Sequence, residues 1–117
     1  MGKKKGFKLK PNEIKPLKTG LGYCFATNMI TIDGKRINFM YRQKPNIDGG
    51  SGWSFFSGYE SDEYANNPKN IQIYDVNTIA NYDPEIIPFL DSPYDSVFER
   101  NQKTGKFEQV YDFEFPE

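Results

Sequence analysis

The sequence predicts a single α+β domain with a mainly antiparallel, twisted sheet and a few short helices. Aromatic residues make up 16% of the 117 residues, whereas all hydrophobic residues together make up only 37%. A core of few, large side chains is typical of sheets rather than of helices. Leucine and alanine are scarce, and no long amphipathic helix is present, which argues against a helical bundle. A chain of this length can bury one core but not two.

Charge divides the chain into a flexible basic arm over residues 1–20 and an acidic domain over residues 21–117. The arm holds seven Lys and one Glu, whereas the rest holds eight basic and fifteen acidic residues. The arm has too little apolar content to order itself, so we expect partial disorder. We expect its apolar residues to dock it in part, namely Phe7, Leu9, Ile14 and Leu17. Lysine clusters neutralise phosphates, but the acidic domain directly behind the arm disfavours nucleic acid as a partner.

The ordered part is predicted to begin with a strand over residues 21–27. A hairpin should follow, with strands over residues 29–32 and 37–42, because Gly34 between them can take the positive φ of a tight turn. Arg42, at the polar end of the second strand, is expected to pair with a carboxylate.

Further along, residues 44–52 are rich in Pro, Asn and Gly and are predicted to form a loop. The next strand is expected over residues 53–56. Acidic residues 60–66 favour a short helix, because carboxylates in a first turn interact well with the helix dipole. Asn67 and Pro68 end that helix, and residues 71–74 read as a short apolar strand.

The segment over residues 75–93 is predicted to be helical only in short pieces. Asp83 precedes Pro84, a combination typical of an N-cap followed by proline at the first helical position. Pro88 follows too soon for a long helix, because it lacks the backbone N–H that the helix requires.

The chain is predicted to end in a hairpin with strands over residues 96–100 and 106–115. Aromatic residues alternate with acidic ones along the second strand, which indicates a half-buried strand. The aromatic positions are Phe107, Tyr111, Phe113 and Phe115.

Absent residue types exclude several kinds of chemistry. The chain has no His, which excludes Ser-His-Asp and Cys-His catalysis and any His-ligated metal. A single Cys24 excludes a thiolate zinc site and an internal disulfide, and its place between aromatic residues predicts burial. We expect no cofactor and no bound metal. No apolar run approaches the length of a membrane span, so we expect a cytoplasmic protein without a membrane partner.

The most informative segment is GWSFFSGYESDEY, residues 52–64. Trp53 and Phe55 are predicted to anchor the core, and Gly58 to bend the chain out of the strand. The residues that follow are predicted to be presented to a partner, and they are Tyr59, Glu60, Asp62, Glu63 and Tyr64. Carboxylates also ligate Mg²⁺ or Ca²⁺ and act as acid and base, so a metal-binding or catalytic role is the alternative for this segment. A solvated helix N-terminus is the preferred interpretation.

A second informative segment, IYDVNTIANYDPEIIPFLDSP, spans residues 73–93. Asn77 and Asn81 are four residues apart and would share a helix face, where capping and turn bonding are the expected roles. Together with the first segment, with MYR (40–42) and with VFER (97–100), it resembles a bacterial family of small domains. That family is grouped among the predicted immunity proteins of polymorphic toxin systems. The similarity spans about residues 21–102.

The family's first block usually reads GWxFFSGDExxEY, so Tyr59 stands here in place of an acid, and any role of an acid at that position does not carry over. The matching positions are Trp53, Phe55, Gly58, Glu60, Glu63, Tyr64, Asn77, Asn81 and Pro84. The resemblance implies an α+β fold and a non-enzymatic protein that binds and neutralises a cognate toxin.

An acidic, aromatic surface fits a basic toxin, and nucleases with basic substrate channels are toxins of this kind. Two alternatives stay open at this point. One is a metal-binding or hydrolytic domain that uses the carboxylates, and the other is a general interaction or regulatory module that uses the basic arm. The sequence sets no oligomeric state.

Overall fold

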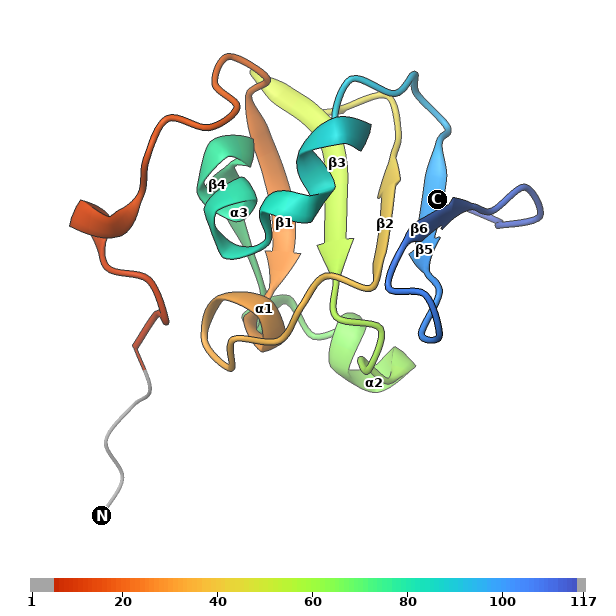
Figure 1. Cartoon of the computed structure of the whole chain (residues 1–117), viewed down its shortest axis with the longest axis horizontal. Coiled ribbons are helices and arrows are strands. Elements are labelled where there is room, and N and C mark those ends of the chain that lie inside the picture. The colour runs from red at the N-terminus through yellow and green to blue at the C-terminus, as the bar shows by residue number, and fades with distance from the viewer. Residues whose placement is uncertain (1–5, 116–117) are drawn as a thin grey trace.

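A six-stranded mixed sheet, with short helices packed against one of its faces, forms the domain (Figure 1). The structure is a computed structural model that describes residues 6–115; the first five residues of the predicted arm and the last two of the chain lie outside it. The strand order is β4-β1-β3-β2-β5-β6. The strands are β1 (Tyr23–Thr27), β2 (Phe39–Arg42), β3 (Gly50–Phe56), β4 (Ile71–Asp75), β5 (Val97–Arg100) and β6 (Phe107–Gln109).

All neighbouring strands are antiparallel except β1 and β3, which are parallel. The predicted α+β class with a mainly antiparallel sheet is therefore confirmed. The helices are short, as predicted. The α-helices are α1 (Asn28–Thr31), α2 (Asp62–Ala65) and α3 (Val76–Tyr82), and the 3₁₀ helices are η1 (Pro11–Glu13), η2 (Pro68–Asn70) and η3 (Pro84–Phe89). None of the helices formed by residues 6–115 has the length and apolarity needed to cross a membrane.

Capping side chains set where the helices begin. The Ser61 hydroxyl accepts a hydrogen bond from the Tyr64 N–H at the start of α2, and the Asp75 carboxylate accepts one from the Asn77 N–H at the start of α3. The Asp83 carboxylate accepts one from the Glu85 N–H, with Pro84 at the first position of η3. The N-cap predicted at Asp83 is confirmed.

The core lies between the sheet and the layer formed by α3 and η3. Trp53 is fully buried, and its ring stacks on Phe55 at a centroid distance of 5.7 Å. Its indole Nε1–H donates to the Leu90 carbonyl at 3.0 Å, so the buried polar atom is satisfied. Cys24 is buried in the same cluster, as predicted. Trp53 therefore joins β3 directly to the end of η3.

The predicted hairpin over residues 29–32 and 37–42 is wrong. The first of these segments lies in and just after α1, and β2 pairs with β3 and β5 instead. Ile30 and Thr31 are adjacent and both buried, which a helical turn in a corner permits but a strand with one solvated face does not. Gly34 has the expected positive φ, but its N–H donates to the Ile30 carbonyl and so ends the helical turn.

The loop predicted over residues 44–52 is too long, because β3 already begins at Gly50. Gly52 lies inside the strand with a φ of +89°, and a Cβ there would collide with the Gln43 carbonyl. The glycine therefore permits a close approach of two backbones rather than marking a loop.

The strand predicted over residues 106–115 is also too long, since β6 ends at Gln109. Tyr111 is 86% exposed rather than half-buried. Phe113 and Phe115 fold back onto Tyr41 of β2, with ring centroids 5.2 and 5.6 Å away. Packing of these rings on the second face of the sheet replaces strand pairing.

Candidate functional site

The segment between β3 and α2 is a tight acidic turn built around the carboxylate of Glu60. This carboxylate accepts hydrogen bonds from the Ser57 N–H at 2.8 Å, the Gly58 N–H at 2.9 Å and the Thr27 hydroxyl at 2.5 Å. Burial raises the pKa of Glu60, but the hydrogen bonds from Thr27 and Ser57 outweigh it and leave that pKa below its ordinary value. Glu60 thus holds the turn against the end of β1.

The predicted partner-binding residues fall into two groups. Tyr59 is 66% exposed, and Asp62 and Glu63 are exposed on the first turn of α2. Glu60 and Tyr64 are half-buried, and burial together with the nearby carboxylates of Asp33 and Glu60 raises the Tyr64 pKa. Both carboxylate oxygens of Glu60 are occupied within the chain, so Glu60 has a structural role and the exposed group carries the surface chemistry.

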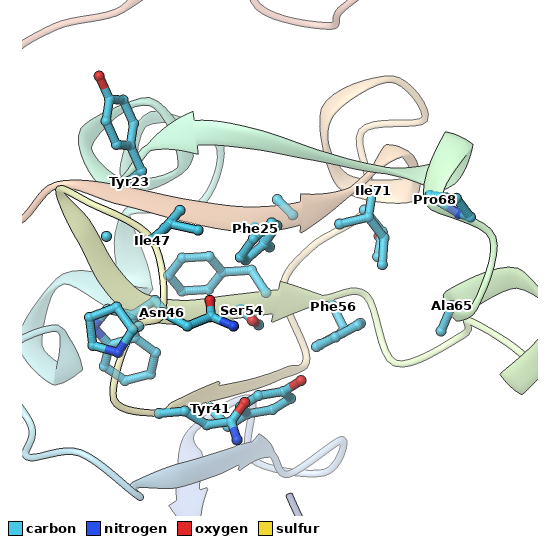
Figure 2. Close-up of a pocket in the computed structure, with 18 of the residues that line it drawn as sticks. Tyr23, Phe25, Tyr41, Asn46, Ile47, Ser54, Phe56, Ala65, Pro68 and Ile71 are labelled. Atoms are coloured by element: carbon cyan, nitrogen blue, oxygen red, sulfur yellow. The ribbon is translucent and has the colours of Figure 1, made fainter. Parts of the chain in front are cut away.

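An open groove of about 600 Å³ lies beside this turn, on the sheet face opposite α3 and η3 (Figure 2). Side chains of Phe25, Ser54 and Phe56 lie along its floor. The loop after β2 and the end of α2 border it, and the residues they contribute are Gln43, Lys44, Pro45, Asn46, Ile47, Ala65 and Asn66. This groove was not predicted from the sequence. Trp53 and Phe55 lie on one face of β3, and Ser54 and Phe56 lie on the other. Phe56 was therefore the signal that the second face is apolar as well.

Asn77 and Asn81 of α3 bind the backbone of the N-terminal arm. The Lys15 carbonyl accepts hydrogen bonds from both side-chain amides at 2.8 Å, and the Lys15 N–H donates to the Asn81 oxygen at 2.9 Å. The Asn77 oxygen also accepts from the N–H groups of Leu17 and Lys18. The expected role was capping and turn bonding, whereas these two side chains clamp a segment about 60 residues away in the chain.

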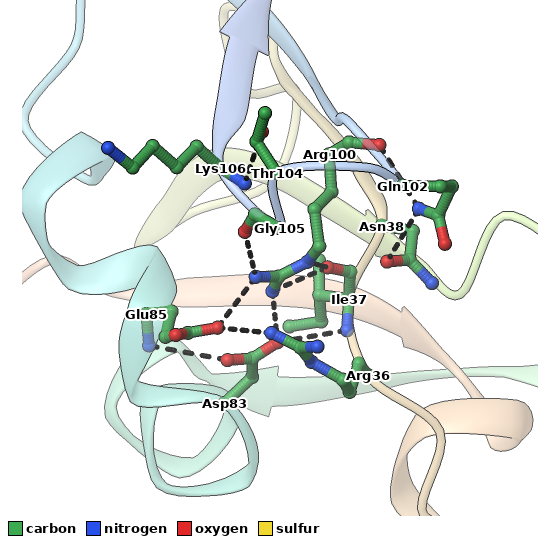
Figure 3. A network of polar contacts seen from close by, with 10 residues as sticks. All are labelled: Arg36, Ile37, Asn38, Asp83, Glu85, Arg100, Gln102, Thr104, Gly105 and Lys106. Carbon is green, nitrogen blue, oxygen red and sulfur yellow. Dashed lines mark hydrogen bonds and ion pairs between the residues drawn. The ribbon is translucent and has the colours of Figure 1, made fainter.

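A buried ion pair that was not predicted from the sequence joins β5 to the start of η3 (Figure 3). Arg100 is 3% exposed, and its guanidinium lies 2.7 Å from the Asp83 carboxylate and 2.6 Å from that of Glu85. It also donates to the Ile37 and Gly105 carbonyls, and its guanidinium carbon lies 4.3 Å from the Phe107 ring centroid. Hydrogen bonds from Arg100 and then Arg36 hold the Glu85 pKa below its ordinary value.

Arg42 was predicted to pair with a carboxylate. This prediction is wrong, because within residues 6–115 its guanidinium bonds to backbone carbonyls instead. Its guanidinium donates to the Ser51 carbonyl at 2.9 Å and to the Ser92 carbonyl at 2.8 Å. The same group lies over the Tyr94 ring at 4.9 Å. Arg42 therefore fastens the loop after η3 to the sheet, because the chain there brings carbonyls rather than carboxylates into reach.

Across residues 6–115, no three or more Cys, Asp and Glu side chains come together in a way that would hold a metal ion. The surface features are instead a rigid acidic turn and an adjacent apolar groove on a small α+β scaffold. An apolar centre with charged groups around it is the usual composition of a protein interface.

Residues 24–111 match the family model described as the immunity protein Imm33 domain. The match covers most of the chain, so this protein belongs to the Imm33 family of immunity proteins. The resemblance noted in the two sequence blocks is confirmed, and the match extends past residue 102 into the C-terminal hairpin. No curated protein and no solved structure matches the chain.

Proposed function

We propose that this protein binds a cognate toxin and neutralises it by occupying its surface, without catalysing a reaction. Membership of the Imm33 family is the observation that carries the proposal. The charge of the chain supports it, because fifteen of the sixteen acidic residues lie after residue 20. An acidic surface steers a basic partner and accelerates encounter. A nuclease with a basic substrate channel is a toxin of suitable charge.

The acidic turn is the first part of the proposed interface. Tyr59, Asp62 and Glu63 are exposed within a stretch of five residues. Hydrogen bonds to the Glu60 carboxylate stabilise the turn that carries them. A preorganised turn loses little conformational entropy on binding, so more of its contact energy appears as affinity. Tyrosine beside carboxylates supplies an anchor and a charged rim.

Co-expression tests the function. The toxin gene adjacent to this gene is expressed with and without the protein, and we expect survival only when the protein is present. The double substitution Asp62→Lys and Glu63→Lys should weaken toxin binding and lower the melting temperature only slightly, because both side chains are exposed and lose only their favourable interaction with the α2 dipole.

The matched control is the double substitution Glu108→Lys and Asp112→Lys. It makes the same change of net charge at exposed positions in and after β6, the far edge of the sheet. We expect it to retain protection. A protein that neither protects cells nor binds the adjacent toxin would refute the proposed function, and equal losses in both double variants would refute the assignment to the acidic turn.

A further inference from the structure

The sheet face opposite α3 is apolar, although none of the helices within residues 6–115 packs across its middle. Phe25 of β1 is directly paired with Ile73 of β4 on one side and with Ser54 of β3 on the other. Ile73 is 54% exposed. A sheet with one solvated face normally alternates apolar and polar residues, but here β1, β3 and β4 carry apolar side chains on the outer face as well. An exposed apolar surface of this kind marks an interaction site in a soluble protein.

Residues 6–115 cover one half of this face and leave the other half open. Phe113 and Phe115 pack on Tyr41 and so cover the surface over β2. The half over β1 and β3 remains open as the groove of about 600 Å³, with Phe25, Ser54 and Phe56 along its floor (Figure 2). That volume is large enough to receive one or two apolar side chains of a partner.

The charge around the open groove selects the partner. Exposed carboxylates lie close in sequence to the lining residues, on the loop after β2 and on α2, and they are Asp48, Asp62 and Glu63. Two exposed lysines lie on the same segments and beside them, and they are Lys44 and Lys69. Carboxylates therefore outnumber lysines at this rim, and a basic surface complements it.

The groove and the acidic turn form one continuous surface. Ala65 at the end of α2 and the next residue, Asn66, line the groove, while the first turn of α2 carries Asp62 and Glu63. A partner that contacts the first turn of α2 therefore has the groove within reach at the other end of the same short helix.

We propose that the groove receives an apolar side chain projecting from the basic surface of the toxin. This inference rests on the proposed toxin-binding function and adds the place where the toxin inserts. A second copy of this chain is a poorer occupant, because it would bring an equally acidic rim against the first. The described part of the N-terminal arm, residues 6–20, is held elsewhere, since its Lys15 backbone is bound by Asn77 and Asn81 on the helical side of the sheet.

Substitutions at two positions of the groove test the proposal by titration calorimetry with the purified toxin domain encoded by the adjacent gene. Ser54→Phe fills the groove from its floor with a residue that strands tolerate well. We expect the Kd to rise about tenfold or more, as when a central anchor of an interface is lost. Gln109→Phe places the same ring at an exposed position of β6 and should leave the Kd unchanged.

Substitutions at a second groove position, Asn46, keep the test decisive if Ser54→Phe perturbs the sheet. Asn46 is exposed on the loop that borders the groove, so its substitution leaves the sheet intact. Asn46→Lys should weaken toxin binding several-fold at low salt, whereas Asn46→Asp should strengthen it, and both effects should fade as salt screens the charges.

Each outcome supports or overturns the inference. Weaker binding by Ser54→Phe and opposite effects of the two Asn46 variants support it. A wild-type protein that binds the toxin while all the groove variants bind equally well overturns the groove and leaves the proposed function standing. Failure of the wild type to bind overturns both. A dimer, measured by analytical ultracentrifugation, that Ser54→Phe abolishes without changing toxin binding would assign this face to a second copy instead.

Discussion

Replacing Glu60 with glutamine tests whether this carboxylate supports the acidic turn. The Glu60 Oε2 atom accepts from the Ser57 N–H and the Thr27 hydroxyl, and Oε1 accepts from the Gly58 N–H. A glutamine has one acceptor oxygen, so its amide N–H₂ must face at least one of these donors. Hydrogen bonds to charged groups contribute about 1.5–3 kcal/mol, and the half-exposed position favours the lower part of that range. We expect Glu60→Gln to lower the free energy of unfolding by about 2 kcal/mol.

Urea denaturation followed by circular dichroism measures this difference, and its pH dependence identifies the cause. The Glu60 pKa lies below the ordinary 4.5 in the folded protein, so the carboxylate's contribution is fully present above about pH 4.5. It is lost as pH falls through the folded-state pKa. The difference between wild type and Glu60→Gln should therefore shrink on acidification.

Glu63→Gln is the matched control, because Glu63 is exposed and should change stability by less than about 0.5 kcal/mol. Equal stability of wild type and Glu60→Gln at pH 7 would refute the reasoning. In that case the three hydrogen bonds contribute no net stability, and Glu60 would return to the set of residues available to a partner.

Three further predictions concern other parts of the molecule. Arg100→Met leaves the Asp83 carboxylate buried without its partner and should cost about 3–5 kcal/mol in urea denaturation, whereas the double variant with Asp83→Asn should recover part of that loss. Asn77→Ala with Asn81→Ala should increase hydrogen exchange at the amides of Lys15, Leu17 and Lys18 and leave β3 protected; unchanged exchange there would contradict the clamp. Cys24 is buried, burial raises its pKa, and it should react with a thiol reagent only after unfolding, so rapid labelling of the native protein would count against the core placement.

The sequence predicted those elements whose signals are local. Apolar runs located β1, β3 and β4, and the N-cap at Asp83 acts on an N–H only two residues further along the chain. Residues 29–32 were misassigned because a short apolar run fits a strand and a buried helical turn equally well. Only the packing of Ile30 in the core decides between them.

The candidate site was predictable in part. Exposure of Tyr59 and Asp62 follows from their position in a polar turn, but the role of Glu60 depends on Thr27, which is 33 residues away. The groove depends on strand order, since β1 and β3 are parallel neighbours separated in sequence by β2. The Arg100 network likewise joins segments whose proximity no local pattern encodes.

The arm's attachment through Asn77 and Asn81 has a consequence for its sequence. These two amides contact the N–H and carbonyl groups of Lys15, Leu17 and Lys18, and such groups are the same for almost every amino acid. The lysines of the arm can therefore be exchanged for other residues without removing these bonds, and only a proline at residue 15, 17 or 18 would delete one of the donors. Lys18 also attaches the arm through its charge, because its ammonium lies 2.7 Å from the Asp91 carboxylate. The charge of the other arm lysines can therefore be redesigned while the bonds to α3 are kept.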